Sequence, residues 1–183
     1  MARPLQALGL ALTDPSARLF PTDEDRNAVR NFRVHDLQQM VALHPGSGSE
    51  TKNWPIENWI KLGDLLLAKG RSLLIIAGEA DTGRMGKLRA AWKQEPVQFA
   101  ENLPLPHLAA LFLGIAFVGH DSGISHIAAA AGARCFLLFG WTDPAIWAPT
   151  NENVTVIRAP EGKMPLLEVA TVAYELMRIG INT

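Results

Sequence analysis

The chain has a single cysteine among its 183 residues, so no disulfide can form within it. This is typical of a reducing compartment such as the cytoplasm. A domain of this length needs no cross-links, because it buries about 70% of the surface that its unfolded chain exposes. Cys135 lies in the apolar run 133–139, where nothing nearby would stabilise a thiolate. We therefore expect a buried and unreactive thiol.

Long hydrophobic runs and an excess of one charge are missing as well. No apolar run approaches the roughly 18 residues that a membrane span requires, and the start of the chain lacks the cleavage site of a signal peptide. The net charge of −1 argues against a nucleic-acid partner held by bulk electrostatics. A composition of 48% hydrophobic and 19% charged residues is typical of a soluble globular domain.

Missing motifs exclude several kinds of chemistry. His120 and His126 are too far apart for one helix face and no CxxC pair exists, so no metal site is predicted. The chain also lacks the G-x-S-x-G elbow of hydrolases and the Walker lysine motif. No G-x-G-x-x-G follows the first expected strand, which disfavours an NAD-dependent oxidoreductase domain.

What the chain does have is a regular alternation of strands and helices after residue 40. Apolar runs predict strands at 41–44, 72–77, 97–100, 115–119, 134–139 and 154–158. Helical spacing predicts helices at 55–69, 83–94, 105–113, 124–131 and 166–179. This alternation predicts an α/β fold, a Rossmann-like, doubly wound parallel sheet with the strand order 3-2-1-4-5-6.

Residues 1–40 differ from the rest because they show no strand pattern. Thr22 and Asp25 form a variant of the capping box and predict a helix that continues to about Gln39. We interpret residues 1–40 as an arm or linker, and residues 41–183 as the α/β domain.

Ligands of such sheets bind where the strand order reverses, here between the first and fourth strands. The loop after the first strand, residues 44–52, is rich in glycine and serine, and so is the loop after the fourth, residues 120–125. Each leads into a helix whose free N–H groups and dipole favour an anion. Gly48 permits close approach of a ligand, and Lys52 adds a positive charge. Two such helix starts suit a ligand with two phosphates.

An acidic residue after the second strand could accept hydrogen bonds from ribose hydroxyls. Glu79 and Asp81 both qualify, and the sequence leaves the choice open. Simpler interpretations stay open too: Asp121 or Ser122 could cap the following helix, His126 could be a half-buried helix residue, and Lys52 a solvated loop lysine. Together the three loops predict a nucleotide-diphosphate site.

Three stretches carry a recognisable pattern. HPGSG at 44–48 precedes KNWP at 52–55, DSGISHIAAA occupies 121–130, and FGWTDP with a later WAP falls within 139–149. In this order and spacing they resemble the motifs of glycosyltransferase family 9, the lipopolysaccharide heptosyltransferases, with Trp141 where proline is usual. The match runs from about residue 41 to 158.

The resemblance implies the C-terminal, donor-binding domain of a GT-B glycosyltransferase, with residues 1–40 as the interdomain connection. In this family the acceptor site and the aspartate base belong to the N-terminal domain, which nothing in residues 1–40 replaces. The isolated chain is therefore expected to be inactive, whether as an excised domain, a truncated product or one of two chains. A stand-alone nucleotide-diphosphate-binding module is the alternative.

The resemblance also assigns site residues. They bind the donor nucleotide sugar and are Ser47, Gly48, Lys52, Asp81, Asp121, Ser122, Gly123 and His126. Lys52 neutralises the departing diphosphate, and the adenine would lie near Leu103 and Leu105. The implied reaction is an inverting transfer of heptose from ADP-heptose to the lipopolysaccharide core. No metal or other cofactor is implied, and the enzyme is expected in the cytoplasm, peripheral to the bacterial inner membrane.

Overall fold

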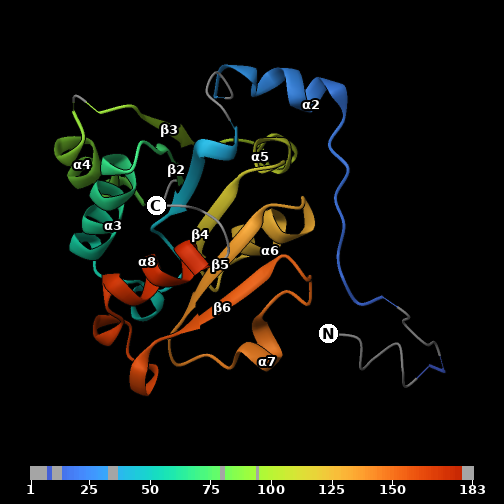
Figure 1. Ribbon diagram of the computed structural model, residues 1–183. Helices are drawn as coiled ribbons and strands as arrows, with labels where there is room; N and C mark the ends of the chain where they lie inside the picture. The colour runs from blue at the N-terminus through green and yellow to red at the C-terminus, as the bar shows by residue number, and fades with distance from the viewer. Residues whose placement is uncertain (1–7, 10–13, 33–36, 79–80, 94, 179–183) are drawn as a thin grey trace.

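The computed structural model describes residues 8–9, 14–32, 37–78, 81–93 and 95–178. Its six strands form one fully parallel sheet in the order β3-β2-β1-β4-β5-β6 (Figure 1). The strands are β1 (Met40–His44), β2 (Ser72–Ala77), β3 (Val97–Glu101), β4 (Ala116–His120), β5 (Arg134–Phe139) and β6 (Val154–Arg158). The doubly wound order predicted from the sequence is confirmed.

Helices cover both faces of the sheet (Figure 1). One face carries α3 (Ile56–Ala68), α4 (Thr82–Ala91) and α8 (Val169–Arg178), and the other carries α2 (Asp23–Ala28), α5 (Leu105–Leu111) and α6 (Gly123–Ala130). On β1, Val41 and Leu43 join the first core, whereas Met40 and Ala42 join the second. Because both sides of each central strand are buried, these strands are continuous apolar runs.

The long helix α3 follows the sequence pattern closely. Trp59, Leu62 and Leu66 are almost fully buried on one of its faces, and each such side chain stabilises the fold by about 1.5–3 kcal/mol. Pro55 is the N-cap residue, and Gly70 lies just beyond the C-cap with a φ of 75°. A positive φ favours glycine at this position.

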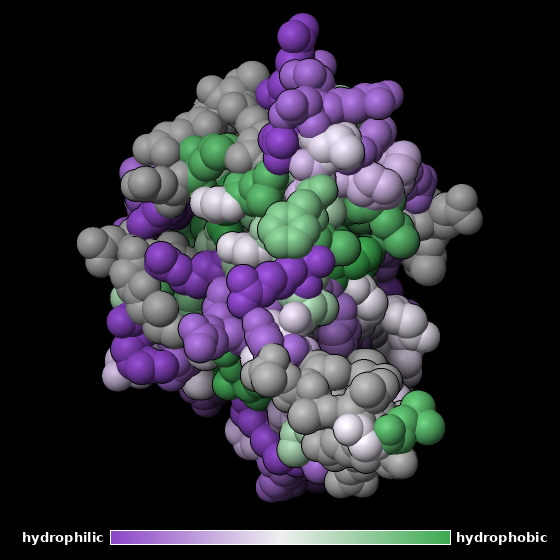
Figure 2. Space-filling model, turned by 90° about the vertical axis from the view of Figure 1, so that its right-hand side faces the viewer, coloured by the Kyte–Doolittle hydropathy of each residue, from purple (hydrophilic) through white to green (hydrophobic). Residues whose placement is uncertain are grey.

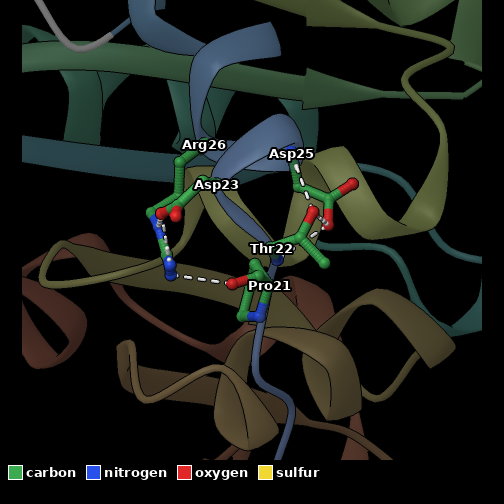
Figure 3. Close-up of polar contacts among 5 residues, drawn as sticks. All are labelled: Pro21, Thr22, Asp23, Asp25 and Arg26. Carbon is green, nitrogen blue, oxygen red and sulfur yellow. Dashed lines mark hydrogen bonds and ion pairs between the residues drawn. The ribbon is translucent and has the colours of Figure 1, made fainter.

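The predicted helix at residues 22–39 is wrong in its length. Its capping box exists: Thr22 accepts a hydrogen bond from the Asp25 N–H, and the Asp25 carboxylate accepts from the Thr22 N–H at 2.9 Å (Figure 3). The helix α2 nevertheless ends at Ala28, and short 3-10 turns follow at 30–32 and 37–39. Asn27 and Asn31 are weak helix formers, and Val29 is fully buried in the core of this face of the sheet, at the position where the helix ends.

The segment before α2 runs in an extended conformation along the side of the domain (Figure 1). The Leu19 N–H donates to the carbonyl of Ala130, at the end of α6, and the Asn151 side chain donates to the carbonyl of Ala17. Phe20 on this segment is 85% exposed. Figure 2 shows the same side of the molecule, where apolar side chains gather between hydrophilic borders.

Two further features concern the sequence predictions. The short helix α7 (Pro144–Trp147) was not predicted; Asp143 caps it by accepting from the Ala145 N–H at 3.0 Å. Cys135 is fully buried as expected, and burial raises the pKa of its thiol to about 12. Within the described ranges, no helix combines the length and apolarity that a membrane crossing needs.

Candidate functional site

The site lies at the carboxyl ends of β1, β2 and β4. His44, the last residue of β1, is in register with Gly119 of β4, so the loops that leave these two strands start side by side. The two segments then diverge, because α3, which follows β1, packs on one face of the sheet and α6, which follows β4, packs on the other. This divergence opens a crevice at the strand ends, as expected for the point of reversal.

Lys52 and Asp121 join the two loops directly. The Lys52 ammonium donates to the Asp121 carboxylate at 2.7 Å, over a sequence separation of 69 residues. The side chain of Asp121 is 7% exposed and that of Lys52 is 26% exposed. A charge-assisted hydrogen bond at this level of burial is stronger than a surface ion pair. Lys52 is therefore not a solvated loop lysine.

His120 connects the same loops from inside the core. Its Nε2 atom accepts a hydrogen bond from the Trp54 N–H at 2.8 Å, and its Nδ1 atom lies 3.3 Å from the carbonyl oxygen of Gly46. The ring is fully buried and meets Trp59 edge-on, with 5.3 Å between ring centroids. Burial lowers the pKa of His120 to about 3, although the hydrogen bond to Gly46 opposes this shift. The ring is therefore neutral at pH 7.

Asp81 is buried between the loops that follow β1 and β2. Its carboxylate accepts from the Gly78 N–H at 2.9 Å, while its own N–H donates to the Gly78 carbonyl. A Cβ atom on Gly46 would lie 1.8 Å from the Asp81 Oδ1 atom, so only glycine fits there. The other candidate of the predicted acidic pair, Glu79, lies outside the described residues.

The start of α6 is not closed by a side-chain cap. Ser122 occupies the N-cap position in an extended conformation, but its hydroxyl makes no capping hydrogen bond. Instead it lies 3.2 Å from the Ser125 hydroxyl, which donates to the carbonyl of His120. The first N–H groups of α6 therefore lack the side-chain partner that a simple cap would supply, which argues against capping as the role of Ser122.

A pocket of about 460 Å³ lies between these loops. Its lining combines polar groups at the strand ends with aliphatic side chains from β2, α5 and α6. It is lined by His44, Ser47, Gly48, Ile76, Ala77, Gly78, Asp81, Asn102, Leu103, Leu105, Leu108, Ser122, Gly123, Ile124 and Ile127. Five of the eight predicted site residues are among them. Lys52, Asp121 and His126 are not part of this lining; His126 is half-buried within α6.

Among the lining residues that the sequence did not single out, two have polar side chains, His44 and Asn102. His44 is only 5% exposed, its Nδ1 atom has no partner among the described residues, and burial lowers its pKa to about 4 despite the nearby Asp81. Asn102 has a φ of 54°, and its N–H donates to the carbonyl of Ala77. The only signal for Asn102 was its residue type, since asparagine tolerates positive φ better than most residues.

No group of three or more His, Cys, Asp and Glu side chains in the described part of the chain could hold a metal ion. The expectation that the reaction needs no metal stays a prediction.

The structural comparison defines the class of fold. The glycosyl transferase family 9 structure from Veillonella parvula superposes with a TM-score of 0.84 at 18% identity, over 99% of this chain and 59% of that one. E. coli heptosyltransferase WaaC, solved with ADP, gives a TM-score of 0.75 at 22% identity over 96% of this chain and 54% of that one. The WaaC structure with ADP-2-deoxy-2-fluoro heptose gives a TM-score of 0.73 at 21% identity, over 96% of this chain and 53% of that one. The fold is the Rossmann-like domain of a GT-B glycosyltransferase.

Sequence comparison then defines the family. The model of glycosyltransferase family 9 (heptosyltransferase) matches residues 5–175, so the chain belongs to this family. Lipooligosaccharide heptosyltransferase 2 of Haemophilus influenzae is 30% identical over 131 residues, which cover 68% of this chain and 38% of that protein. The chain thus spans about 40–60% of the length of the relatives named here.

The contact between Gly46 and Asp81 leads to a first prediction. Gly46→Ala should lower the free energy of unfolding by about 1–3 kcal/mol, because the added Cβ overlaps the buried carboxylate. Urea unfolding measures this loss. Gly48→Ala is the matched control, since a Cβ there meets nothing within 4 Å. The double variant Gly46→Ala/Asp81→Ala should lose less than the sum of the single losses; strict additivity would contradict the clash.

The two buried histidines make stability depend on pH. Burial lowers the pKa of His44 to about 4 and that of His120 to about 3, from 6.5. In the unfolded chain both rings take up protons as the pH falls below about 6.5, while the folded chain does not. The contribution of these two rings to the free energy of unfolding is therefore fully present above about pH 6.5. It falls below that pH by up to about 1.4 kcal/mol per pH unit for each histidine.

Urea unfolding between about pH 7 and pH 5 tests this expectation, in a range above the titration of most carboxylates. His120→Gln should show a shallower decline than the wild type, because one of the two groups is removed. Equal slopes for the two proteins would contradict the neutral, buried state of His120.

Proposed function

We propose that this chain is the donor-binding half of a heptosyltransferase that transfers heptose from ADP-heptose to a lipopolysaccharide core. The observation that carries the proposal is the convergence of three loops, after β1, β2 and β4, around one pocket lined by polar groups at the strand ends and by aliphatic side chains. Membership of family 9 and the ADP and ADP-heptose analogue named for the WaaC structures support the choice of donor.

The lining of the pocket supports one orientation of a bound nucleoside diphosphate in this proposal. The aliphatic part, which includes Leu103, Leu105 and Ile127, suits the adenine ring. We assign the ribose hydroxyls to Asp81 at the pocket wall, and the diphosphate to Ser47, Gly48 and the start of α6 at Ser122 and Gly123.

Lys52 is assigned to the leaving group. As the bond from the anomeric carbon to the diphosphate breaks, negative charge grows on the departing ADP. The ion pair with Asp121 holds the Lys52 ammonium between the two loops, so little reorganisation is needed when this charge appears. We assign His126 to a hydrogen bond at the diphosphate or the sugar, as the motif implies.

The acceptor hydroxyl must lose a proton as it attacks the anomeric carbon from the face opposite the diphosphate. We assign the base that takes this proton, and the site for the lipopolysaccharide core, to the part of the relatives that this chain does not match. The reaction needs no metal in this proposal. We place it in the cytoplasm, at the inner membrane surface.

A stand-alone nucleotide-diphosphate-binding module is the second candidate. It is favoured by the same observation, since the pocket and the start of α6 that borders it lie within the described residues. Binding alone does not separate the two functions, whereas turnover with an added acceptor half does.

Calorimetric titration with ADP, ADP-heptose, UDP and NAD tests the donor site. We expect ADP and ADP-heptose to bind best.

Lys52→Ala should weaken ADP binding by about tenfold or more, because it removes a hydrogen bond to a charged group, and His126→Ala should weaken it less. Lys87→Ala, an exposed lysine on α4 paired with Glu57, is the matched control. Binding of NAD but not of ADP-sugars would overturn the proposal, and unchanged affinity in both site variants would overturn the residue assignment.

The location of the base gives a separate prediction. The 183-residue chain, incubated with ADP-heptose and a heptose-free lipopolysaccharide core, should release no ADP above the background of hydrolysis. A coupled ADP-release assay measures this. Mixing the chain with the N-terminal half of a family member should restore turnover if the halves assemble. Transfer by the chain alone would show that the base lies within these residues.

A further inference from the structure

The loop from Gly46 to Trp54 carries Ser47, Gly48 and Lys52, so its conformation decides where half of the proposed site lies. Its internal hydrogen bonds are local: the Ser47 hydroxyl donates to the Ser49 carbonyl at 2.8 Å, and the Lys52 N–H donates to the same oxygen at 3.0 Å. Local bonds shape the loop but do not fix its position relative to β4.

His120 supplies the connection that the local bonds lack. It contacts the loop at both ends, through Gly46 at its start and Trp54 at its end, and it does so from the last position of β4. The next residue along the chain, Asp121, pairs with Lys52 in the middle of the loop. One strand end therefore touches the loop at three points.

The hydrogen bonds define the protonation state of the ring. The Trp54 N–H can only donate, so the Nε2 atom must be the unprotonated acceptor. The Nδ1 atom then carries the proton and donates to the Gly46 carbonyl. This tautomer satisfies two buried backbone groups with one side chain, and leaving either of them unpaired would be costly.

We propose that His120 is a positioning residue for nucleotide-diphosphate binding: as a neutral ring protonated at Nδ1, it holds both ends of the 46–54 loop against β4. The inference rests on the proposed function for its effect on ligand affinity. Its effect on the loop is independent of any ligand. Lys52 lies between Gly46 and Trp54 in this loop, so a shift of either end would move the ammonium that is assigned to the diphosphate.

Nuclear magnetic resonance tests the ligand-independent part in the full 183-residue chain. With ¹⁵N-labelled histidine, the His120 ring should show a protonated Nδ1 and an unprotonated Nε2 at neutral pH, and the Trp54 amide should exchange slowly with solvent. A protonated Nε2, or a Trp54 amide that exchanges as fast as those of exposed loops, would overturn the positioning role.

Substitutions test the effect on binding. His120→Gln can place its side-chain oxygen near the Nε2 position and accept from Trp54, whereas His120→Leu fills space but makes neither hydrogen bond. We expect ADP affinity to fall about tenfold or more in His120→Leu, as for the loss of a buried hydrogen bond, and to recover to within about threefold of the wild type in His120→Gln.

The matched control is Asn153→Ala. Asn153 donates to the carbonyls of Ala129 and Ala133, at the end of α6 remote from the pocket. This variant should lower the melting temperature without changing ADP affinity, with all titrations run well below that temperature. If His120→Leu loses no affinity, or if Asn153→Ala loses as much, His120 is only a stabilising residue and the proposal fails.

The two proposals can fail separately. If the wild-type chain binds neither ADP nor ADP-heptose, the proposed function fails, and the tautomer and the Trp54 amide still decide the role of His120. If the wild type binds ADP and the ring has the opposite tautomer, only the role of His120 fails.

Discussion

The adjacency of β1 and β4 at the centre of the sheet is the constraint on which the rest of the site depends. The order of strands reverses between them, so the helices that follow must leave towards opposite faces. The two loops cannot pack on each other along their whole length, and a crevice results. Of the eight residues predicted to bind the donor, all except Asp81 belong to one of these two loops or to the start of α6.

The polar residues of this crevice bind one another closely. Lys52 pairs with Asp121, Asp81 lies against the α-carbon of Gly46, and His120 joins two loop backbones. Each contact ties a group from one strand end to a group from another. These contacts exist without a ligand, so the donor binding proposed above would need little ordering of the loops.

The sheet could be predicted from the sequence because its signal is local and repeated. Strands such as β2 are apolar throughout, and helices such as α3 bury side chains at a spacing of three and four residues. Once the strand order is predicted, it also predicts which loops are neighbours. The prediction failed where tertiary contacts decided the outcome. Val29 is buried in the core where α2 ends early, and α7 is a single turn made by Asp143 and Pro144.

By itself, the sequence determined the α/β fold, the order of its strands and the family, because short motifs and apolar periodicity are properties of neighbouring residues. It also singled out the residues of the two loops. Only the tertiary structure decided which of these line the pocket and which hold it together. His120 and Gly46 are 74 residues apart in the chain, and the tautomer and the neutrality of the ring follow from burial and from partners that no local pattern contains.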